Sequence, residues 1–237
     1  MTATDDLTVQ LEAIRAKRGY LLPHHGLMAL TSPRLLAAYD ATYTALTLED
    51  RILDAHDKEF VWLAILISTD EALATHHIAK FRSASGTVDE IDSVLALAAL
   101  ALGVRAHRFI VDHWSVALPD IDPAGNFLAA QRRIAPAIAP RLIHLAMLAV
   151  LAAKAEWRVL HWQFVAAYAD QVPEDEIAEA LSLMMFPGSV PHFVEACGVW
   201  RHMILANEVA ASPRYSAWAA LVGQEGFDPA RASSGNG

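Results

Sequence analysis

The sequence is poor in cysteine and in charged residues. Its only cysteine is Cys197, and charged residues make up 19% of its 237 residues. One thiol cannot form an internal disulfide, which excludes two-cysteine redox chemistry within the chain and gives no sign of an oxidising compartment. The N-terminus also lacks the basic-then-apolar order of a secretory signal. We therefore expect a cytoplasmic protein.

Basic residues are fewer than acidic ones. The chain has 18 lysines and arginines against 27 aspartates and glutamates, a formal net charge of −9. This charge repels phosphate backbones and anionic lipids, so we expect no nucleic-acid and no membrane partner. A small-molecule substrate and other protein subunits remain. The hydrophobic fraction of 54% is more than one small globule hides, which favours a homo-oligomer.

Long apolar runs and strand patterns are both missing. The most apolar stretches, 94–104 and 142–153, are shorter than the roughly 20 residues that span a bilayer, and we interpret them as core helices. No run of alternating β-branched residues predicts a strand, so the predicted class is all-α. Glycine, proline and capping residues divide the chain into helical segments. Six of them form two similar trios, at 58–68, 71–85 and 87–103, and at 141–154, 156–169 and 174–186.

The order of these segments predicts two related helical units in one chain. The segment 118–126 has two prolines and a glycine, and we expect it to be a hinge between units at 1–117 and 127–224. Residues 225–237 are expected to form a flexible tail. Short matches support a duplication. They pair 63–66 with 145–148 at an offset of 82, and 89–91 with 175–177 at an offset of 86.

Several short motifs resemble the carboxymuconolactone decarboxylase and alkylhydroperoxidase-D superfamily. In the first half they are the run EFVWLAIL at 59–66, the histidine-bearing helix after it, Gly86 and 89–91; in the second they are 145–149, Trp157 with His161, 175–177 and 187–188. The resemblance implies an all-helical subunit of the alkylhydroperoxidase-D-like type. It also implies association, commonly as trimers of tandem repeats or hexamers of single ones. We expect a trimer or a dimer.

The chain departs from the peroxidase branch of that superfamily. There the middle helix carries Cys-x-x-Cys-x-x-x-His, and the preceding helix carries a glutamate that activates the thiols. The cysteine positions here hold Glu71 and Ala74 if Ile78 takes the histidine position, and Asp70 and Leu73 if His77 takes it. Either register puts a carboxylate in place of the first thiol. The first register also places Glu59 at the position of the activating glutamate.

The second half of the chain also departs from the peroxidase motif, with other residues at the motif positions. The resemblance places His161 at the histidine position, with Lys154 and Trp157 at the cysteine positions and Leu142 in place of the glutamate. The two halves are therefore expected to be chemically unequal.

Glu59 and His77 are the main catalytic candidates in the first half. A carboxylate buried in the apolar run around Glu59 would have a raised pKa, as a general acid or base requires. The alternative is a solvated glutamate in the first turn of a helix. His76 and His77 point about 100° apart on a helix, so only one can face a given pocket; we favour His77. Alternatively, His77 is a structural residue whose polar atoms are hydrogen-bonded, or a residue at a subunit interface.

His161 and Trp157 are the candidates in the second half. Four residues apart, they would share one helix face and place a flat apolar wall beside an imidazole. Trp157 is equally well explained as a core residue. The chain has eleven histidines, but no two of them are four residues apart, as in the zinc-binding helix of a zincin. None of them accompanies a pair of cysteines. We expect no metal and no cofactor.

The favoured function is a cofactor-independent lyase (decarboxylase) or isomerase that acts on a small carboxylated or lactone-like metabolite by acid–base chemistry. Glu59 or His77 would move the proton, and His161 or Arg82 would orient an anionic group. The expected substrate-binding residues are Trp157, Glu71, His76 and Arg82. Two alternatives remain open: a degenerate binding or assembly protein without catalysis, and a reductase that uses Cys197 alone.

Overall fold

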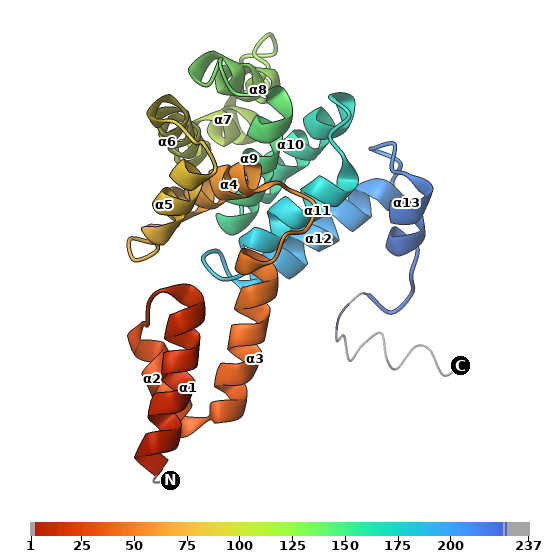
Figure 1. The fold of residues 1–237 in the computed structure, drawn as a ribbon. Coiled ribbons are helices and arrows are strands. Elements are labelled where there is room, and N and C mark those ends of the chain that lie inside the picture. The colour runs from red at the N-terminus through yellow and green to blue at the C-terminus, as the bar shows by residue number, and fades with distance from the viewer. Residues whose placement is uncertain (1–2, 225, 227–237) are drawn as a thin grey trace, which may run out of the picture. The chain divides into compact units, whose positions relative to one another are not determined.

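The computed structural model describes residues 3–224 and residue 226, which form helices joined by turns and contain no strand (Figure 1). The predicted all-α class is confirmed. The expected tail at 225–237 lies outside the described residues, apart from residue 226. The elements are α1 (Ala3–Arg18), α2 (Pro23–Thr31), α3 (Pro33–Tyr43), the π-helical turn η1 (Thr44–Leu48), α4 (Ala55–Ser68), α5 (His76–Ser83), α6 (Val88–Leu102), α7 (Arg105–Phe109), the π-helical turn η2 (Ile110–Trp114), α8 (Pro123–Ile134), α9 (Pro140–Ala153), α10 (Trp157–Ala169), α11 (Glu174–Leu183), α12 (Val190–Leu205) and α13 (Pro213–Ala219).

The contacts within the chain divide it into two compact units, residues 1–50 and 51–237. The segment 118–126, which we expected to be a hinge, lies inside the second unit. There it forms the turns that follow η2 and the first turn of α8.

The first unit is a small helical arrangement in which α2 packs against both α1 and α3. Its apolar core consists of Ile14, Ala29 and Leu36. The side chain of Arg18 is only 1% exposed and forms an ion pair with Asp40, at 2.7 Å. The Arg18 guanidinium also lies 3.0 Å from Nε2 of His25, which is fully buried. A buried polar cluster therefore links the three helices.

Helix α9 is the centre of the second unit (Figure 1). Every residue from Leu142 to Ala153 is buried, because the helix packs against α4, α10 and α11 as well as α6, α8 and α12. A helix that is apolar on all sides is stable only when it is surrounded in this way. Helix α4 has the same character, and most of its residues are buried.

Two trios of helices, α4–α6 and α9–α11, follow one another in the second unit. The turns after the first helix of each contain a residue with positive φ, Asp70 at 59° and Ala155 at 56°. Main-chain hydrogen bonds at the helix ends also recur. The equivalent bonds are Glu71 N to Leu66 O with Glu156 N to Leu151 O, and Gly86 N to Phe81 O with Val172 N to Ala167 O.

These bonds define which residues correspond between the trios. The offset is 85 residues along α4 and α9, and 86 residues along the two helices that follow. Our sequence match gave 86 for the third helices but 82 for the first, so the first helices were aligned three residues away from their structural correspondence.

The run Val88–Trp114, which joins α6, α7 and η2, is long and apolar enough to cross a membrane by length and composition. We had considered only the shorter stretch 94–104. One face of the run, including Val94 and Leu97, belongs to the core of the unit, and a core helix meets the same two criteria.

Candidate active site

A glutamate and a histidine form a buried pair between α4 and α5. Nδ1 of His77 lies 2.6 Å from Oε2 of Glu59. The two side chains are only 2% and 3% exposed. The structure thus brings together the two residues that the sequence indicated as the main catalytic candidates of the first half.

Local sequence features place both residues. Asp54 caps α4 by accepting a hydrogen bond from the main-chain N–H of Asp57, at 2.8 Å, which fixes the start of the helix at Ala55, four residues before Glu59. The chain then turns through Asp70, and α5 begins at His76. We had expected this second helix to begin at Glu71. Helices α4 and α5 pack against each other, and the contact between Glu59 and His77 brings the second turn of α4 to the first turn of α5.

Aromatic rings enclose the imidazole of His77. The Trp62 ring is stacked on it, with ring centroids 4.6 Å apart and an interplanar angle of 29°. The His76 ring also contacts it, with ring centroids 4.3 Å apart and an interplanar angle of 41°. The indole N–H of Trp62 is buried and has no hydrogen-bond partner among the described residues. A buried donor without a partner is costly, and a bound oxygen atom would relieve that cost.

Two lysines are found near this pair, and Lys80 interacts electrostatically with Glu59 and with Lys58. Lys58 precedes Glu59 on α4 and is buried, and Lys80 is on α5, one turn after His77. The pKa of Lys80 is lowered, chiefly because burial disfavours the charged ammonium and further because of Lys58, while Glu59 acts in the opposite sense.

The contact between Glu59 and His77 allows proton transfer. An ionised carboxylate accepts a hydrogen bond from the N–H at Nδ1, so the second ring nitrogen of a neutral imidazole is the basic one. When the imidazole takes up a proton there, the carboxylate stabilises the resulting cation. The pair can thus serve as a general base and, once protonated, as a general acid.

The second trio has different residues at the corresponding positions. Glu59 corresponds to His144, and His77 corresponds to Gln163. These two are also in contact, with Nε2 of Gln163 donating to Nδ1 of His144 over 2.7 Å. The other ring nitrogen of His144 donates to Asp170, at 2.9 Å. Burial lowers the pKa of His144 against the opposing effect of Asp170, which keeps this imidazole neutral.

A small cavity of about 160 Å³ lies beside His144 and is also lined by Gln131, Arg132 and Asp170. Sequence reasoning did not find this cluster. Its signal was His144, a polar residue inside an otherwise apolar helical run. Both ring nitrogens of His144 are engaged, one by Gln163 and one by Asp170, so neither is available as a base in this arrangement.

An ionic network connects the first turns of the two trios. His56 lies 3.1 Å from Glu90, and the corresponding residues Arg141 and Glu176 also form an ion pair. Arg141 contacts Asp57 as well. Asp54, His56 and Asp57 place oxygen and nitrogen atoms within 4.8 Å of one another, but each of the three already has a protein partner.

Four other residues expected at the site lie elsewhere. His161 is 40% exposed and pairs with Glu208 at the surface, and Trp157 packs edge-on against His192. Glu71 and Arg82 are exposed. His161 is also not the counterpart of His77 in the second trio, because that position is occupied by Gln163.

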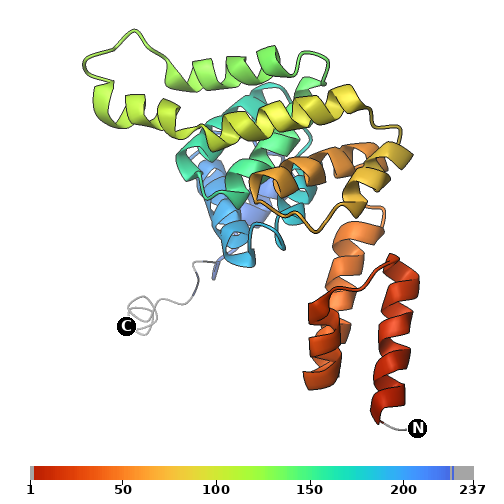
Figure 2. The same cartoon turned by 90° about the vertical axis from the view of Figure 1, so that its left-hand side faces the viewer.

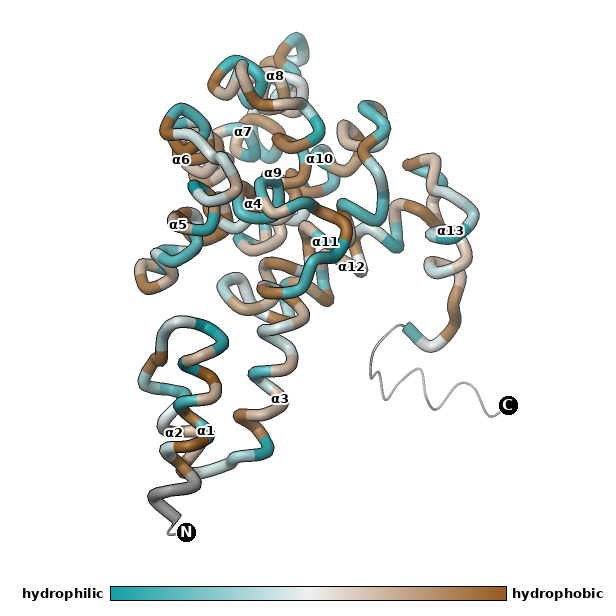
Figure 3. The backbone as a smooth tube through the Cα atoms, viewed as in Figure 1, coloured by the Kyte–Doolittle hydropathy of each residue, from teal (hydrophilic) through white to brown (hydrophobic). Residues whose placement is uncertain are grey.

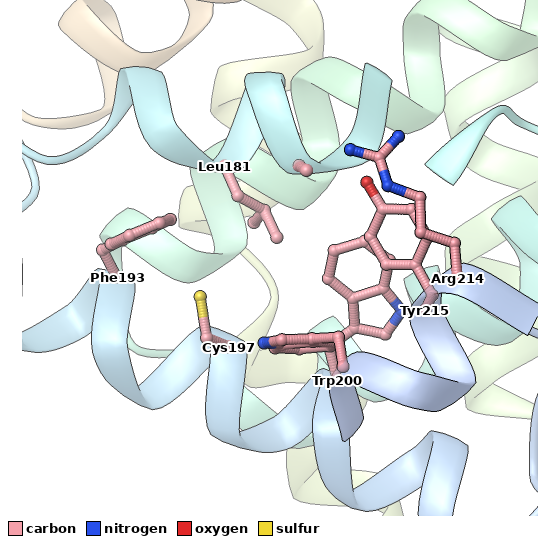
Figure 4. A pocket seen from close by; sticks show the side chains of 8 residues that line it. Leu181, Phe193, Cys197, Trp200, Arg214 and Tyr215 are labelled. Carbon is pink, nitrogen blue, oxygen red and sulfur yellow. The ribbon is translucent and has the colours of Figure 1, made fainter. Parts of the chain in front are cut away.

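A larger, mainly apolar pocket lies between α11, α12 and α13 (Figure 4). Its volume is about 330 Å³. Its lining consists of Ala178, Leu181, Phe193, Cys197, Trp200, Arg214, Tyr215 and Trp218. Burial raises the pKa of the Cys197 thiol to about 11, so the thiol is protonated at neutral pH. This argues against a reductase that relies on Cys197, because the thiolate is the reactive form.

One comparison with known proteins gave a result. The model of the Carboxymuconolactone decarboxylase family matches residues 33–111, about a third of the chain. The matched region contains α4, α5 and α6 and therefore includes both Glu59 and His77. Searches of curated proteins and of solved structures found no match. Over residues 33–111 this helical chain is therefore similar to the Carboxymuconolactone decarboxylase family.

Proposed function

We propose that the protein is a cofactor-independent lyase or isomerase that transfers a proton to or from a small carboxylated or lactone-like metabolite. The observation that carries this proposal is the buried hydrogen bond between Glu59 and His77. The match to the Carboxymuconolactone decarboxylase family over the same residues supports it.

In a decarboxylation of this type, the bond between the carboxylate carbon and the adjacent carbon breaks and carbon dioxide leaves. The electron pair stays on the substrate as an enolate, which must then receive a proton. His77, protonated and paired with Glu59, is placed to donate that proton. Lys80, which interacts electrostatically with Glu59, would attract an anionic substrate and stabilise the enolate when its ammonium is protonated. The N–H of Trp62 offers a hydrogen bond to a substrate oxygen.

We further propose that the two helix trios arose by duplication and that only the first retains an active site. The recurring helix-end hydrogen bonds at offsets of 85 and 86 residues support the duplication. The replacement of the Glu59–His77 pair by His144 and Gln163 supports the loss of proton-transfer chemistry in the second trio. We also propose a cytoplasmic homo-oligomer.

The test is release of carbon dioxide from carboxymuconolactone by the purified protein. The variant His77→Gln keeps a hydrogen-bonding side chain next to Glu59 but cannot carry the proton. We expect it to lower turnover by about 10²–10⁴-fold, the usual contribution of general acid–base catalysis. His161→Gln is the matched control at a surface histidine, and its turnover should stay within twofold of wild type. Equal activity of His77→Gln and wild type would contradict the proposal.

A second candidate function is binding or assembly without catalysis. The near-complete burial of the Glu59 and His77 side chains favours it, because a substrate reaches the imidazole only if the surrounding helices move. Under this alternative, Glu59→Gln and His77→Ala leave ligand affinity unchanged. Measured turnover of any lactone substrate that depends on His77 would exclude it.

A further inference from the structure

A second candidate binding site is the pocket between α11, α12 and α13, which we call the α11–α13 pocket. Its lining residues come from these three helices, and none of them belongs to α4 or α5. Figure 1 and Figure 2 show α5 and α12 on different sides of the second unit. The pocket is thus separate from the Glu59–His77 pair, and the proposed proton transfer makes no use of it.

The size of the pocket suits a small molecule. Its volume of about 330 Å³ lies within the range of ligand-binding pockets, about 300–1,000 Å³. An apolar cavity of about 150 Å³ binds one benzene ring, so this pocket has room for about two fused rings. One turn of an α-helix, about 10 Å wide and 5.4 Å long, occupies about 400 Å³, which is more than the pocket holds. A helix of a protein partner therefore does not fit into it.

Three aromatic rings form one wall of the α11–α13 pocket. The Trp200 ring is stacked on that of Tyr215, with ring centroids 5.0 Å apart and an interplanar angle of 28°. The Trp218 ring lies edge-on to Tyr215, at 6.2 Å. Phe164, which is fully buried, stacks on Trp200 at 5.5 Å. This packing anchors the wall in the core, so the pocket is formed before a ligand enters, as is usual for small-molecule sites.

The polar groups of this wall are hydrogen-bonded to other protein groups. The hydroxyl of Tyr215 donates to Asp175, at 2.7 Å, and the guanidinium of Arg214 donates to both carboxylate oxygens of Asp175, at 3.1 Å. The indole N–H of Trp200 donates to the hydroxyl of Tyr168, at 2.9 Å. Because Asp175 balances the charge of Arg214, the described lining of the pocket carries no unbalanced charge.

The opposite side of the pocket is apolar. Figure 3 shows both apolar and polar residues along α11 and α12, but the five that line the pocket from these helices are Ala178, Leu181, Phe193, Cys197 and Trp200. In Figure 4 the sulfur of Cys197 points into the space. Burial raises the pKa of this thiol to about 11, and a protonated thiol behaves as a small hydrophobic group. The thiol therefore adds to the apolar lining.

We propose that the α11–α13 pocket is a binding site for a small, uncharged aromatic molecule of about two rings. The three-ring wall favours an aromatic ligand, because aromatic rings prefer offset-stacked or edge-on aromatic neighbours. The balanced charges favour an uncharged ligand, because an ion would lose its hydration here without gaining a partner of opposite charge. Filling the pocket also gives its lining atoms the packing contacts that an empty space denies them.

The first test is binding of 2-naphthol, which has two fused rings and is uncharged at pH 7, to the purified protein by isothermal titration calorimetry. We expect Cys197→Phe, which places a ring inside the pocket, to bind 2-naphthol about tenfold more weakly than wild type or worse. Leu205→Phe adds the same ring at an exposed position of α12 outside the pocket, and its affinity should stay within twofold of wild type. Absence of binding to wild type, or equal affinities of Cys197→Phe and wild type, would overturn the proposal.

Charged and saturated analogues of 2-naphthol test which chemical class the pocket selects. We expect 2-naphthoate and decahydro-2-naphthol both to bind wild type more weakly than 2-naphthol does. Asp175→Asn keeps an oxygen that accepts from Tyr215 but leaves Arg214 without its counter-charge, so this variant should bind 2-naphthoate more tightly than wild type and 2-naphthol within twofold of wild type. Binding of either analogue to wild type as tightly as 2-naphthol would contradict an uncharged aromatic ligand.

The indole N–H signals in a proton–nitrogen NMR spectrum locate the bound 2-naphthol in the wild-type protein, so this measurement does not require a pocket variant to fold. The ligand should shift the signals of Trp200 and Trp218, which line the pocket, and leave that of Trp62, which is stacked on His77, in place. Each signal is assigned by its loss when that tryptophan is replaced by phenylalanine. A shift of the Trp62 signal without shifts of the other two would place the ligand at the Glu59–His77 pair and overturn the proposal.

Discussion

Replacing His77 by leucine tests whether the Glu59–His77 contact is a charged, mutually dependent pair. The variant leaves the carboxylate of Glu59 buried without its partner, because both side chains are at most 3% exposed. Removing one member of a buried ion pair costs about 3–5 kcal/mol. For a chain of this size each kcal/mol lowers the melting temperature by about 2–4 °C, so His77→Leu should melt about 6–20 °C below wild type.

The double variant Glu59→Leu/His77→Leu is the informative control. It removes both polar groups and keeps the site filled, and such replacements of buried pairs are often close to neutral. It still loses the stacking of His77 on Trp62, which is worth about 1 kcal/mol. We therefore expect the double variant to be more stable than His77→Leu by about 2 kcal/mol or more.

The assay is thermal unfolding followed by tryptophan fluorescence. All six tryptophans lie beyond residue 50, so the signal reports on the second unit. If the double variant lost as much stability as the sum of the two single variants, the two residues would not interact. A decrease of less than about 1 kcal/mol in the free energy of unfolding of His77→Leu would equally refute the reasoning, because a buried, unpaired carboxylate destabilises a fold by more than this.

Three further predictions concern pH, reactivity and packing. Burial, with the positive charges of its neighbours, lowers the pKa of His25 from 6.5 to about 4. Between pH 6.5 and 4 the unfolded chain therefore binds a proton at His25 that the folded chain does not. The first unit should lose stability as the pH falls through this range. Amide hydrogen exchange of α2 measures this loss, and His25→Gln should make it shallower. Alkylation of Cys197 by iodoacetamide should be slow at pH 7–8 in the folded protein and fast in urea, because burial raises the pKa of the thiol to about 11; equal rates would contradict this. Gly86→Ala should cost about 1–3 kcal/mol, because a Cβ at this position would lie 2.4 Å from the buried ring of Phe81; Gly198→Ala, which meets nothing within 4 Å, is the control in calorimetry and should be neutral or stabilising.

The first half of the site was predictable from sequence. Glu59 lies in an apolar run that must be buried on all sides, and such a carboxylate needs a partner. The short turn after α4 leaves α5 as the nearest source of one. The sequence did not decide which register of α5 faces Glu59, and the structure shows that His77 does.

The second half was predicted less well, and the reason is physical. Runs of leucine and alanine match each other at several offsets, and our match of the first helices differed from the structural one by three residues. A shift of three residues turns a helix by about 300°, so the wrong residues are assigned to each face. The resemblance likewise placed Leu142, two residues before His144, in the position of Glu59, and His161, two residues before Gln163, in the histidine position.

The most direct test of the central claim, that the Glu59 carboxylate makes His77 a proton-transfer group, is the rate of carbon dioxide release from carboxymuconolactone by Glu59→Gln. This variant keeps the shape of the side chain and an oxygen that can accept from Nδ1 of His77, and removes only the charge. We predict at least a hundred-fold lower rate than wild type, at an equal folded fraction, with partial recovery in Glu59→Asp. A Glu59→Gln rate within twofold of wild type would contradict the claim.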